Sequence, residues 1–192
     1  MRKLGPGLLL IAFCLWLIPQ VAWGASAMVK YGNKGVKVEE VQAMLYHLHL
    51  YNDLVDGDFG SKTLAAVKKF QLQCRRPSNG MVDAQLYKLM SKKSGLDFAK
   101  YRKVWVMETT GYTAHDPGCS GITATGMPLR QGIIAADTAI IPMGTQVYVM
   151  GYGRASVQDT GSAIRGNIID LAFNSRGEAL RWGRRMARVY IL

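Results

Sequence analysis

Two patterns of apolar and polar positions divide the chain. Between residues 28 and 92, apolar side chains recur every three or four positions, which is the spacing of one face of a helix. Three such series contain Val38, Val41, Leu45 and Leu48, then Leu64, Val67 and Phe70, then Leu86, Leu89 and Met90. We therefore predict a three-helix domain over residues 28–92, small but large enough to fold alone.

Polar residues are expected to start these helices and to form their loops. Ser61 is the predicted N-cap of the second helix and Asp83 that of the third. The loop at residues 56–58, Asp-Gly-Asp, begins like a calcium-binding loop but lacks the later ligands, so calcium is not expected. His47 and His49 would face different sides of a helix without a third ligand, so no metal site is expected either.

From Val104 the pattern changes to short β-like runs joined by glycine-rich connections. The runs are residues 104–107, 133–136, 146–150, 155–157, 167–173 and 187–192. Six strands of this kind indicate a small barrel or sandwich over residues 104–192. Only Ser175 to Trp182 is predicted to be helical, and Gly183 would end that helix. Residues 93–103 are polar and basic and are the predicted linker.

Three aspartates lie at or within the predicted strands. Asp170 stands in an apolar run without a turn residue, and a carboxyl group among apolar neighbours has a raised pKa, as a general acid at neutral pH requires. Asp159 opens an Asp-Thr-Gly turn with Thr160 and Gly161, so a turn role and a catalytic role are both open. Asp137 precedes a Pro and Gly turn, and the capping of that turn is its favoured role.

The Asp-Thr-Gly sequence at residues 159–161 is also the signature of aspartic peptidases. Those enzymes need two such aspartates that share one proton. This chain has one copy, so a dimer would be required, and the peptidase reading ranks well below the others.

The N-terminus has the pattern of a secretory signal peptide. Arg2 and Lys3 precede an apolar run, Leu8 to Ile18, and small residues allow cleavage after Gly24 or Ala27. We predict that residues 1–27 are a signal peptide and that no transmembrane segment remains after its removal. A retained membrane anchor is the alternative, but the apolar run is short for a membrane span.

Charge and cysteine content add two expectations. The formal charge of +11 is spread over both halves without a nucleic-acid motif, so an anionic cell-wall surface or outer membrane is the predicted partner. A merely solvated basic surface is the alternative. After signal removal two cysteines remain, Cys74 and Cys119, and either one disulfide or two free thiols would fit an exported protein.

The first domain resembles the peptidoglycan-binding domain 1 family. The resemblance rests on Gly-x-x-Val-x-x-Val-Gln-x-x-Leu (35–45), Val-Asp-Gly-x-Phe-Gly-x-x-Thr (55–63), Ala-Val-x-x-Phe-Gln (66–71) and Gly-x-Val-Asp (80–83). It implies a three-helix module that holds the protein on peptidoglycan and does no chemistry itself.

The second domain resembles the three-aspartate (3D) domain. The resemblance rests on Thr-Gly-Tyr-Thr-Ala (110–114), Gly-Ile-Thr-Ala-Thr-Gly (121–126), Gly-Ile-Ile-Ala-x-Asp (132–137), Asp-Thr-Gly (159–161) and Gly-Asn-x-Ile-Asp (166–170). This family is similar to the catalytic domain of membrane-bound lytic transglycosylase A and to stationary-phase and resuscitation-promoting cell-wall enzymes. The resemblance implies an α + β chain in which a six-stranded double-psi β-barrel follows the helical module.

The resemblance also implies a reaction, cleavage of the β-1,4 bond between N-acetylmuramic acid (MurNAc) and N-acetylglucosamine (GlcNAc) with 1,6-anhydro-MurNAc formation. Asp170 would act as acid and then base, Asp159 would stabilise positive charge or tune Asp170, and Asp137 would fix a loop. Residues expected to line the glycan groove are Tyr112, Thr113, Thr125, Gly126, Thr160 and Gly161. No metal or cofactor is required. A non-catalytic, expansin-like wall-binding protein and a hydrolytic muramidase are the alternatives, and secretion to the wall or periplasm is expected.

Overall fold

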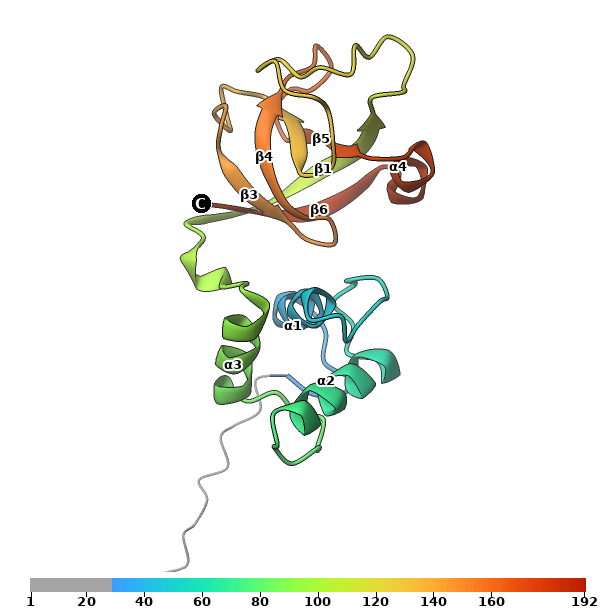
Figure 1. Cartoon of the computed structure of the whole chain (residues 1–192). Helices are drawn as coiled ribbons and strands as arrows, with labels where there is room; N and C mark the ends of the chain where they lie inside the picture. Colours follow the sequence, from blue (N-terminus) through green and yellow to red (C-terminus); the bar gives the residue numbers. More distant parts are fainter. Residues whose placement is uncertain (1–28) are drawn as a thin grey trace, which may run out of the picture.

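The computed structural model describes residues 29–192, so the predicted signal peptide lies outside the described residues. A helical part is followed by a β-barrel, with the barrel stacked on the helices (Figure 1). The predicted fold class, a helical module before a six-stranded barrel, is confirmed. Within residues 29–192, no helix has the length and apolar character needed to cross a membrane.

The helical part contains α1 (Val36–His47), α2 (Ser61–Gln73) and α3 (Ala84–Ser94). The predicted apolar series form its core, because Val38, Val41, Leu45, Val67, Phe70, Leu86 and Met90 are all buried. The Asp83 carboxylate accepts a hydrogen bond from the Leu86 N–H and caps α3 as predicted. Since α1 ends at His47, His49 lies beyond it rather than within a helix.

The predicted cap of α2 is wrong by one residue. Gly60 keeps an extended backbone and is the N-cap, so Ser61 is already the first helical residue and makes no capping bond. The reason is that the Gly60 carbonyl accepts the first helical hydrogen bond, from the Leu64 N–H at 2.9 Å.

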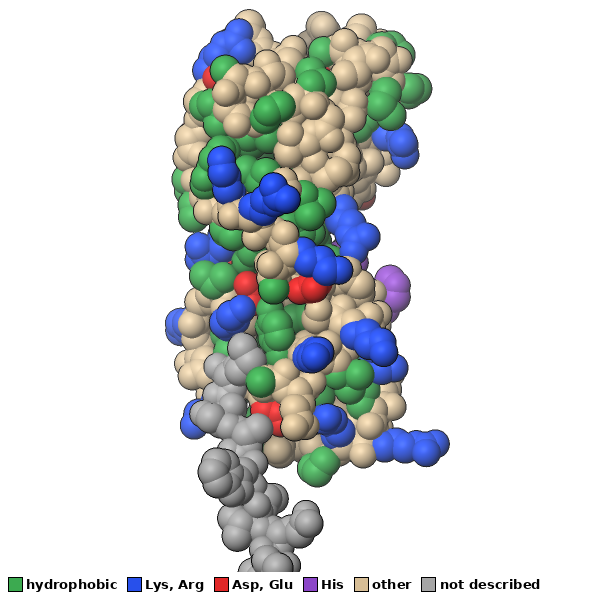
Figure 2. Space-filling model, turned by 90° about the vertical axis from the view of Figure 1, so that its left-hand side faces the viewer, with side chains coloured by type: hydrophobic (Ala, Val, Ile, Leu, Met, Phe, Trp, Pro, Cys, Tyr) green, Lys and Arg blue, Asp and Glu red, His purple; other side chains and the backbone are tan. Residues whose placement is uncertain are grey.

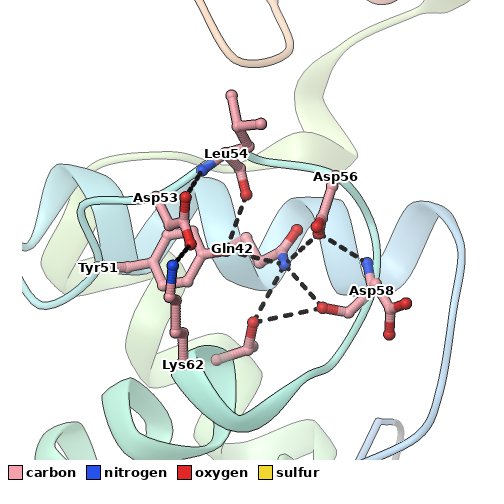
Figure 3. A network of polar contacts seen from close by, with 8 residues as sticks. Gln42, Tyr51, Asp53, Leu54, Asp56, Asp58 and Lys62 are labelled. Carbon is pink, nitrogen blue, oxygen red and sulfur yellow. Dashed lines mark hydrogen bonds and ion pairs between the residues drawn. The ribbon is translucent and has the colours of Figure 1, made fainter.

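One buried amide holds the first loop of the helical part (Figure 3). Gln42 on α1 is 0% exposed, and its Nε2 donates to Asp56 Oδ1 at 2.8 Å and to the Asp58 carbonyl at 3.0 Å. Its Oε1 accepts from the Gly57 N–H at 2.8 Å. The loop therefore uses Asp56 internally, and no cluster of three metal-ligating side chains occurs among the described residues.

Gln71 on α2 holds the second loop in the same way. Its Nε2 donates to Asn79 Oδ1 at 2.8 Å and to the Met81 carbonyl at 2.9 Å, and its Oε1 accepts from the Gly80 N–H at 2.8 Å. Gly80 has a φ of +74°, and a Cβ there would lie 2.3 Å from Leu64 Cδ1. In both loops, the side-chain amide of a helix glutamine therefore holds an Asx-Gly turn through the same pattern of hydrogen bonds.

The second part is a closed barrel with strand order β1-β5-β2-β4-β3-β6, in which the β1–β5 and β2–β4 pairs are parallel. Its elements are β1 (Lys103–Thr113), β2 (Ile133–Ala136), β3 (Gln146–Val149), β4 (Gly153–Asp159), β5 (Ile168–Phe173), α4 (Arg176–Trp182) and β6 (Arg185–Ile191). All six predicted runs are strands. Helix α4 is also as predicted, and Ser175 caps it.

Strand β1 is longer than the sequence pattern predicts. It continues to Thr113, so Tyr112 and Thr113 lie within the strand and do not follow it. The physical reason is pairing, because residues 108–113 run in parallel register with residues 168–173 of β5. Tertiary hydrogen bonding overrides the weak local pattern of this polar stretch.

The two parts pack directly against each other. Phe98, in the short 3-10 helix η1 (Phe98–Lys100), has its ring centroid 5.4 Å from that of Tyr148 and 4.9 Å from that of Tyr190. The Arg188 Nε lies 2.7 Å from a carboxylate oxygen of Glu39 on α1. Aromatic packing and an ion pair therefore fix the barrel on the helices.

We predict that Gln42→Ala lowers the free energy of unfolding by about 2–3 kcal/mol, because the buried Gly57 N–H loses its acceptor and the loop loses its clamp. Urea unfolding monitored by circular dichroism measures the change. Gln73→Ala is the matched control, since Gln73 is an exposed glutamine on α2. Equal stability of the two variants would contradict the assigned role of the clamp.

Candidate active site

Asp170 lies in the middle of β5, between β1 and β2, where it pairs with Thr110 and Ala135. The Thr110 hydroxyl donates to Asp170 Oδ1 at 2.8 Å. The adjacent Ile169 and Leu171 are fully buried, and Asp170 itself is half-buried. The strand alternation thus places one carboxyl group on the barrel face opposite to the apolar core side chains.

The environment of Asp170 favours its neutral form. Burial raises the pKa of Asp170 above its ordinary value, and the negative charges of Asp116 and Asp159 raise it further. The Thr110 hydroxyl and the Leu171 N–H oppose this shift. A carboxyl group with a raised pKa keeps its proton to higher pH than an exposed aspartate, which is a property that a general acid needs.

Asp159 ends β4 and is held by three donors. The Tyr112 hydroxyl donates to its Oδ2 at 2.9 Å, and the N–H groups of Ala124 and Thr160 donate to its Oδ1 at 2.9 Å each. Burial, followed by the charge of Asp159, raises the pKa of Tyr112, so this phenol remains a donor. The Asp159 carboxyl group is therefore held in place and joins β1, β4 and the loop at residues 114–131.

Asp137 has a different environment. Its Oδ2 accepts from the Gly166 N–H at 2.9 Å and its Oδ1 from the Ala139 N–H at 3.1 Å. These two hydrogen bonds lower the pKa of Asp137, and the bond from Gly166 has the larger effect. Asp137 thus caps a turn, as the sequence indicated, and ties the end of β2 to the loop before β5.

The other candidate residues surround the Asp159 end of the barrel. The Thr125 hydroxyl donates to the Gln158 carbonyl at 3.1 Å and to its side-chain oxygen at 2.9 Å, which seats the long loop on β4. Gly126 and Thr160 are exposed there and Gly161 is half-buried. Thr113 differs, because its side chain is 0% exposed and faces the interior.

The sequence reasoning missed two residues that act on Asp170. Thr110 belongs to the Thr-Gly-Tyr-Thr-Ala motif, and it lies two positions before Tyr112, so the two side chains share one face of the strand. Asp116 follows β1 in a turn, where its Oδ2 accepts from the Thr113 N–H at 2.8 Å. A predicted strand that continues to Thr113 would place Thr110 beside Tyr112 on one face.

The cysteines settle one open alternative. Cys74 and Cys119 are free and half-buried, so the structure contains the two thiols rather than the disulfide. They belong to the helical part and to the loop after β1, respectively.

Two stretches of the chain match known families. Residues 34–90 match the family described as "Putative peptidoglycan binding domain", and residues 132–192 match the "3D domain". Two relatives from Bacillus subtilis (strain 168) match about half of the chain. The "Putative cell wall shaping protein YabE" is 47% identical over 94 residues, 47% of this chain and 23% of the relative. The "Cell wall-binding protein YocH" is 45% identical over 94 residues, 47% of this chain and 33% of the relative.

The matched stretch therefore spans at most a third of the length of these two relatives. Among solved structures, the SleB N-terminal domain is 30% identical, covering 34% of this chain and 90% of that one with a TM-score of 0.34. MltA from E. coli is 24% identical, covering 36% and 26% with a TM-score of 0.33. Residues 34–90 thus match a peptidoglycan-binding domain family, and residues 132–192 match the 3D domain family.

Proposed function

We propose that this protein is a peptidoglycan lytic transglycosylase that cleaves the β-1,4 bond between MurNAc and GlcNAc. The observation that carries the proposal is Asp170, a half-buried carboxyl group whose pKa is raised beside a second, immobilised carboxylate. The match to the 3D domain and the wall-related names of the B. subtilis relatives support the same class of substrate.

In the first step, protonated Asp170 donates its proton to the glycosidic oxygen while the C1–O bond to the leaving GlcNAc breaks. The 6-hydroxyl of the same MurNAc attacks C1, and the resulting Asp170 carboxylate accepts the proton of that hydroxyl. The products are a 1,6-anhydro-MurNAc end and a free GlcNAc hydroxyl, and no water is consumed. One group serves as acid and base in turn, where ordinary glycosidases use a carboxylate pair.

Asp159 has two roles in this proposal. Its negative charge contributes to the raised pKa of Asp170, and it can stabilise the positive charge that develops at C1. The three donors from Tyr112, Ala124 and Thr160 hold the carboxylate in position, so little reorganisation is needed during the reaction. Asp137 acts on loop structure and does not contact the reacting atoms.

The helical module would bind peptidoglycan and keep the barrel on its substrate. Its family match supports this role, and so does the basic surface of the chain, with a formal charge of +11. On the face in Figure 2, Lys and Arg side chains are spread over both modules. Such a surface favours an anionic wall over a nucleic-acid partner, given the absence of a nucleic-acid motif. We propose that the protein is exported and acts in the cell wall or periplasm.

We predict that Asp170→Asn lowers the release of soluble muropeptides from purified peptidoglycan about 10²–10⁴-fold, the usual contribution of a general acid–base group. Mass spectrometry of the wild-type digest should show 1,6-anhydro ends. Asp58→Asn is the control, because Asp58 belongs to the helical module and forms an exposed ion pair with Lys34, and it should digest like wild type.

Each of the other outcomes would indicate a different function or mechanism for this protein. Wild-type turnover by Asp170→Asn would remove Asp170 from the mechanism. Reducing ends in the products would mean a hydrolytic muramidase, with water as the nucleophile. If wild type and Asp170→Asn both sediment with peptidoglycan and release nothing, the protein is a non-catalytic wall-binding protein.

A second prediction follows from the opposite pKa shifts of Asp170 and Asp137. The raised pKa of Asp170 contributes stability that is present below the unfolded pKa of about 3.9 and is lost as pH rises through the folded pKa. The stability of wild type relative to Asp170→Asn should therefore fall as pH rises from about 3 to 7. Urea unfolding across this range measures it.

Asp137→Asn is the internal control for the sign. The lowered pKa of Asp137 contributes stability that is present above the unfolded pKa and lost as pH falls through the folded pKa. The stability of wild type relative to Asp137→Asn should therefore rise with pH. Parallel pH profiles for the two variants would show that the environments of these aspartates are misassigned.

A further inference from the structure

A groove of about 730 Å³ lies between the helical module and the barrel, away from the three aspartates. One wall comes from the end of α1 and the loop at residues 52–55. The other wall comes from the β3–β4 turn, α4 and β6. The proposed reaction at Asp170 does not use this space.

The two walls of the groove are held at a fixed separation. The ion pair between Arg188 on β6 and Glu39 on α1 joins them, with side chains only 28% and 16% exposed. The packing of Phe98 on Tyr148 and Tyr190 also holds the barrel against the helical module. A groove between rigidly packed modules is preformed, so a ligand does not have to order it on binding.

Both walls expose apolar side chains. Tyr46 and Leu54 on the helical module are 53% and 66% exposed, and Val106 and Met186 on the barrel are 48% and 58% exposed. Apolar side chains gathered on facing walls of a groove typically mark a binding site.

In the part of the chain that the structure describes, the acidic side chains along the groove all have partners, whereas two of the basic side chains have no ion-pair partner. Its three carboxylates are all engaged, Glu39 with Arg188, Asp53 with Lys62, and Glu178 with the Ser175 hydroxyl and N–H. In contrast, Arg181 and Arg185 form no ion pair with any carboxylate in residues 29–192.

Arg185 is nonetheless fixed in place. Its guanidinium lies 4.5 Å from the centroid of the Trp182 ring, and it donates to the carbonyl groups of Trp182 at 2.6 Å and Arg181 at 2.9 Å. The groove therefore presents an immobilised cation and a second, exposed cation beside apolar side chains.

We propose that this groove binds the acidic peptide of peptidoglycan, an inference that rests on the proposed function and extends it to a second part of the same polymer. Peptides attached to MurNAc carry carboxylates and small methyl side chains, which match guanidinium groups next to Leu54 and Met186. The sugar backbone alone offers hydroxyl and acetamido groups and would leave both arginines without an anionic partner.

The groove lies within reach of a substrate held at Asp170. Trp182 Nε1 in the groove wall donates to Thr109 Oγ1 at 3.0 Å, and the next residue, Thr110, holds Asp170. Val106 in the groove lies four residues before Thr110 on β1, about 13 Å along the strand. One peptidoglycan strand can therefore contact both places.

The test uses the full exported chain and an uncleavable soluble probe, N-acetylmuramyl-L-Ala-γ-D-Glu-meso-diaminopimelate, with titration calorimetry. We expect Arg181→Glu and Leu54→Ser each to weaken binding about tenfold. Arg176→Glu is the matched control, because Arg176 is an exposed arginine of the same helix outside the groove. Leu72→Ser is the second control, since Leu72 is 64% exposed on α2. Both controls should bind like wild type.

Three results would overturn the inference. They are equal probe affinity of Arg181→Glu and Arg176→Glu, no binding of the probe by wild type, and loss of binding to peptide-free chitotetraose in the groove variants. The probe has no glycosidic bond to cleave, so it reports binding and not the reaction. If wild type binds the probe through Arg181 but releases no anhydro products from peptidoglycan, the proposed activity alone is refuted. Anhydro products without probe binding would refute the groove alone.

Discussion

The parallel pairing of β1 with β5 is the constraint on which the barrel site depends. It aligns Thr110 with Asp170 and places Tyr112 where its hydroxyl meets Asp159 at the end of β4. Close packing beside this pair requires Gly111, because a Cβ there would lie 2.9 Å from the Phe173 ring and 3.2 Å from the Ala179 Cα. A strand pair of this kind needs a long crossover, and here that crossover carries the remaining candidate residues.

A second constraint is the packed interface between the helical module and the barrel. It determines how substrate bound by the helices can reach the barrel site. Glu40 is 4% exposed at this boundary and accepts hydrogen bonds from Tyr87 and Tyr190, with Lys37 as its ion-pair partner. A flexible tether would only raise the local concentration of substrate. A packed interface, as here, also fixes the direction from which a strand held by the helices approaches the barrel.

Local patterns were enough to predict the helices, the six strands and Asp170 as the unusual carboxyl group. Periodicity reports which face of an element is buried, and it did so for both modules. It did not report the full length of β1, because that stretch is polar and is held by pairing with β5. Nor could it reveal the interface, since Phe98, Tyr148 and Tyr190 come from three separate elements and meet only in the folded chain.

The three aspartates have identical side chains but different hydrogen-bond donors around them, and these donors distinguish their roles. Asp137 accepts two backbone N–H groups and Asp159 accepts two more plus a phenol, so both carboxylates are committed to structure or to a fixed charge. Asp170 accepts the Thr110 hydroxyl, with the Leu171 N–H as a second donor, in a more buried position. Hydrogen-bond donors stabilise the charged form of a carboxyl group and burial disfavours it, so the pKa of Asp137 is lowered and that of Asp170 is raised. The surroundings of Asp170, and not its place in a motif, therefore distinguish it as the candidate acid and base.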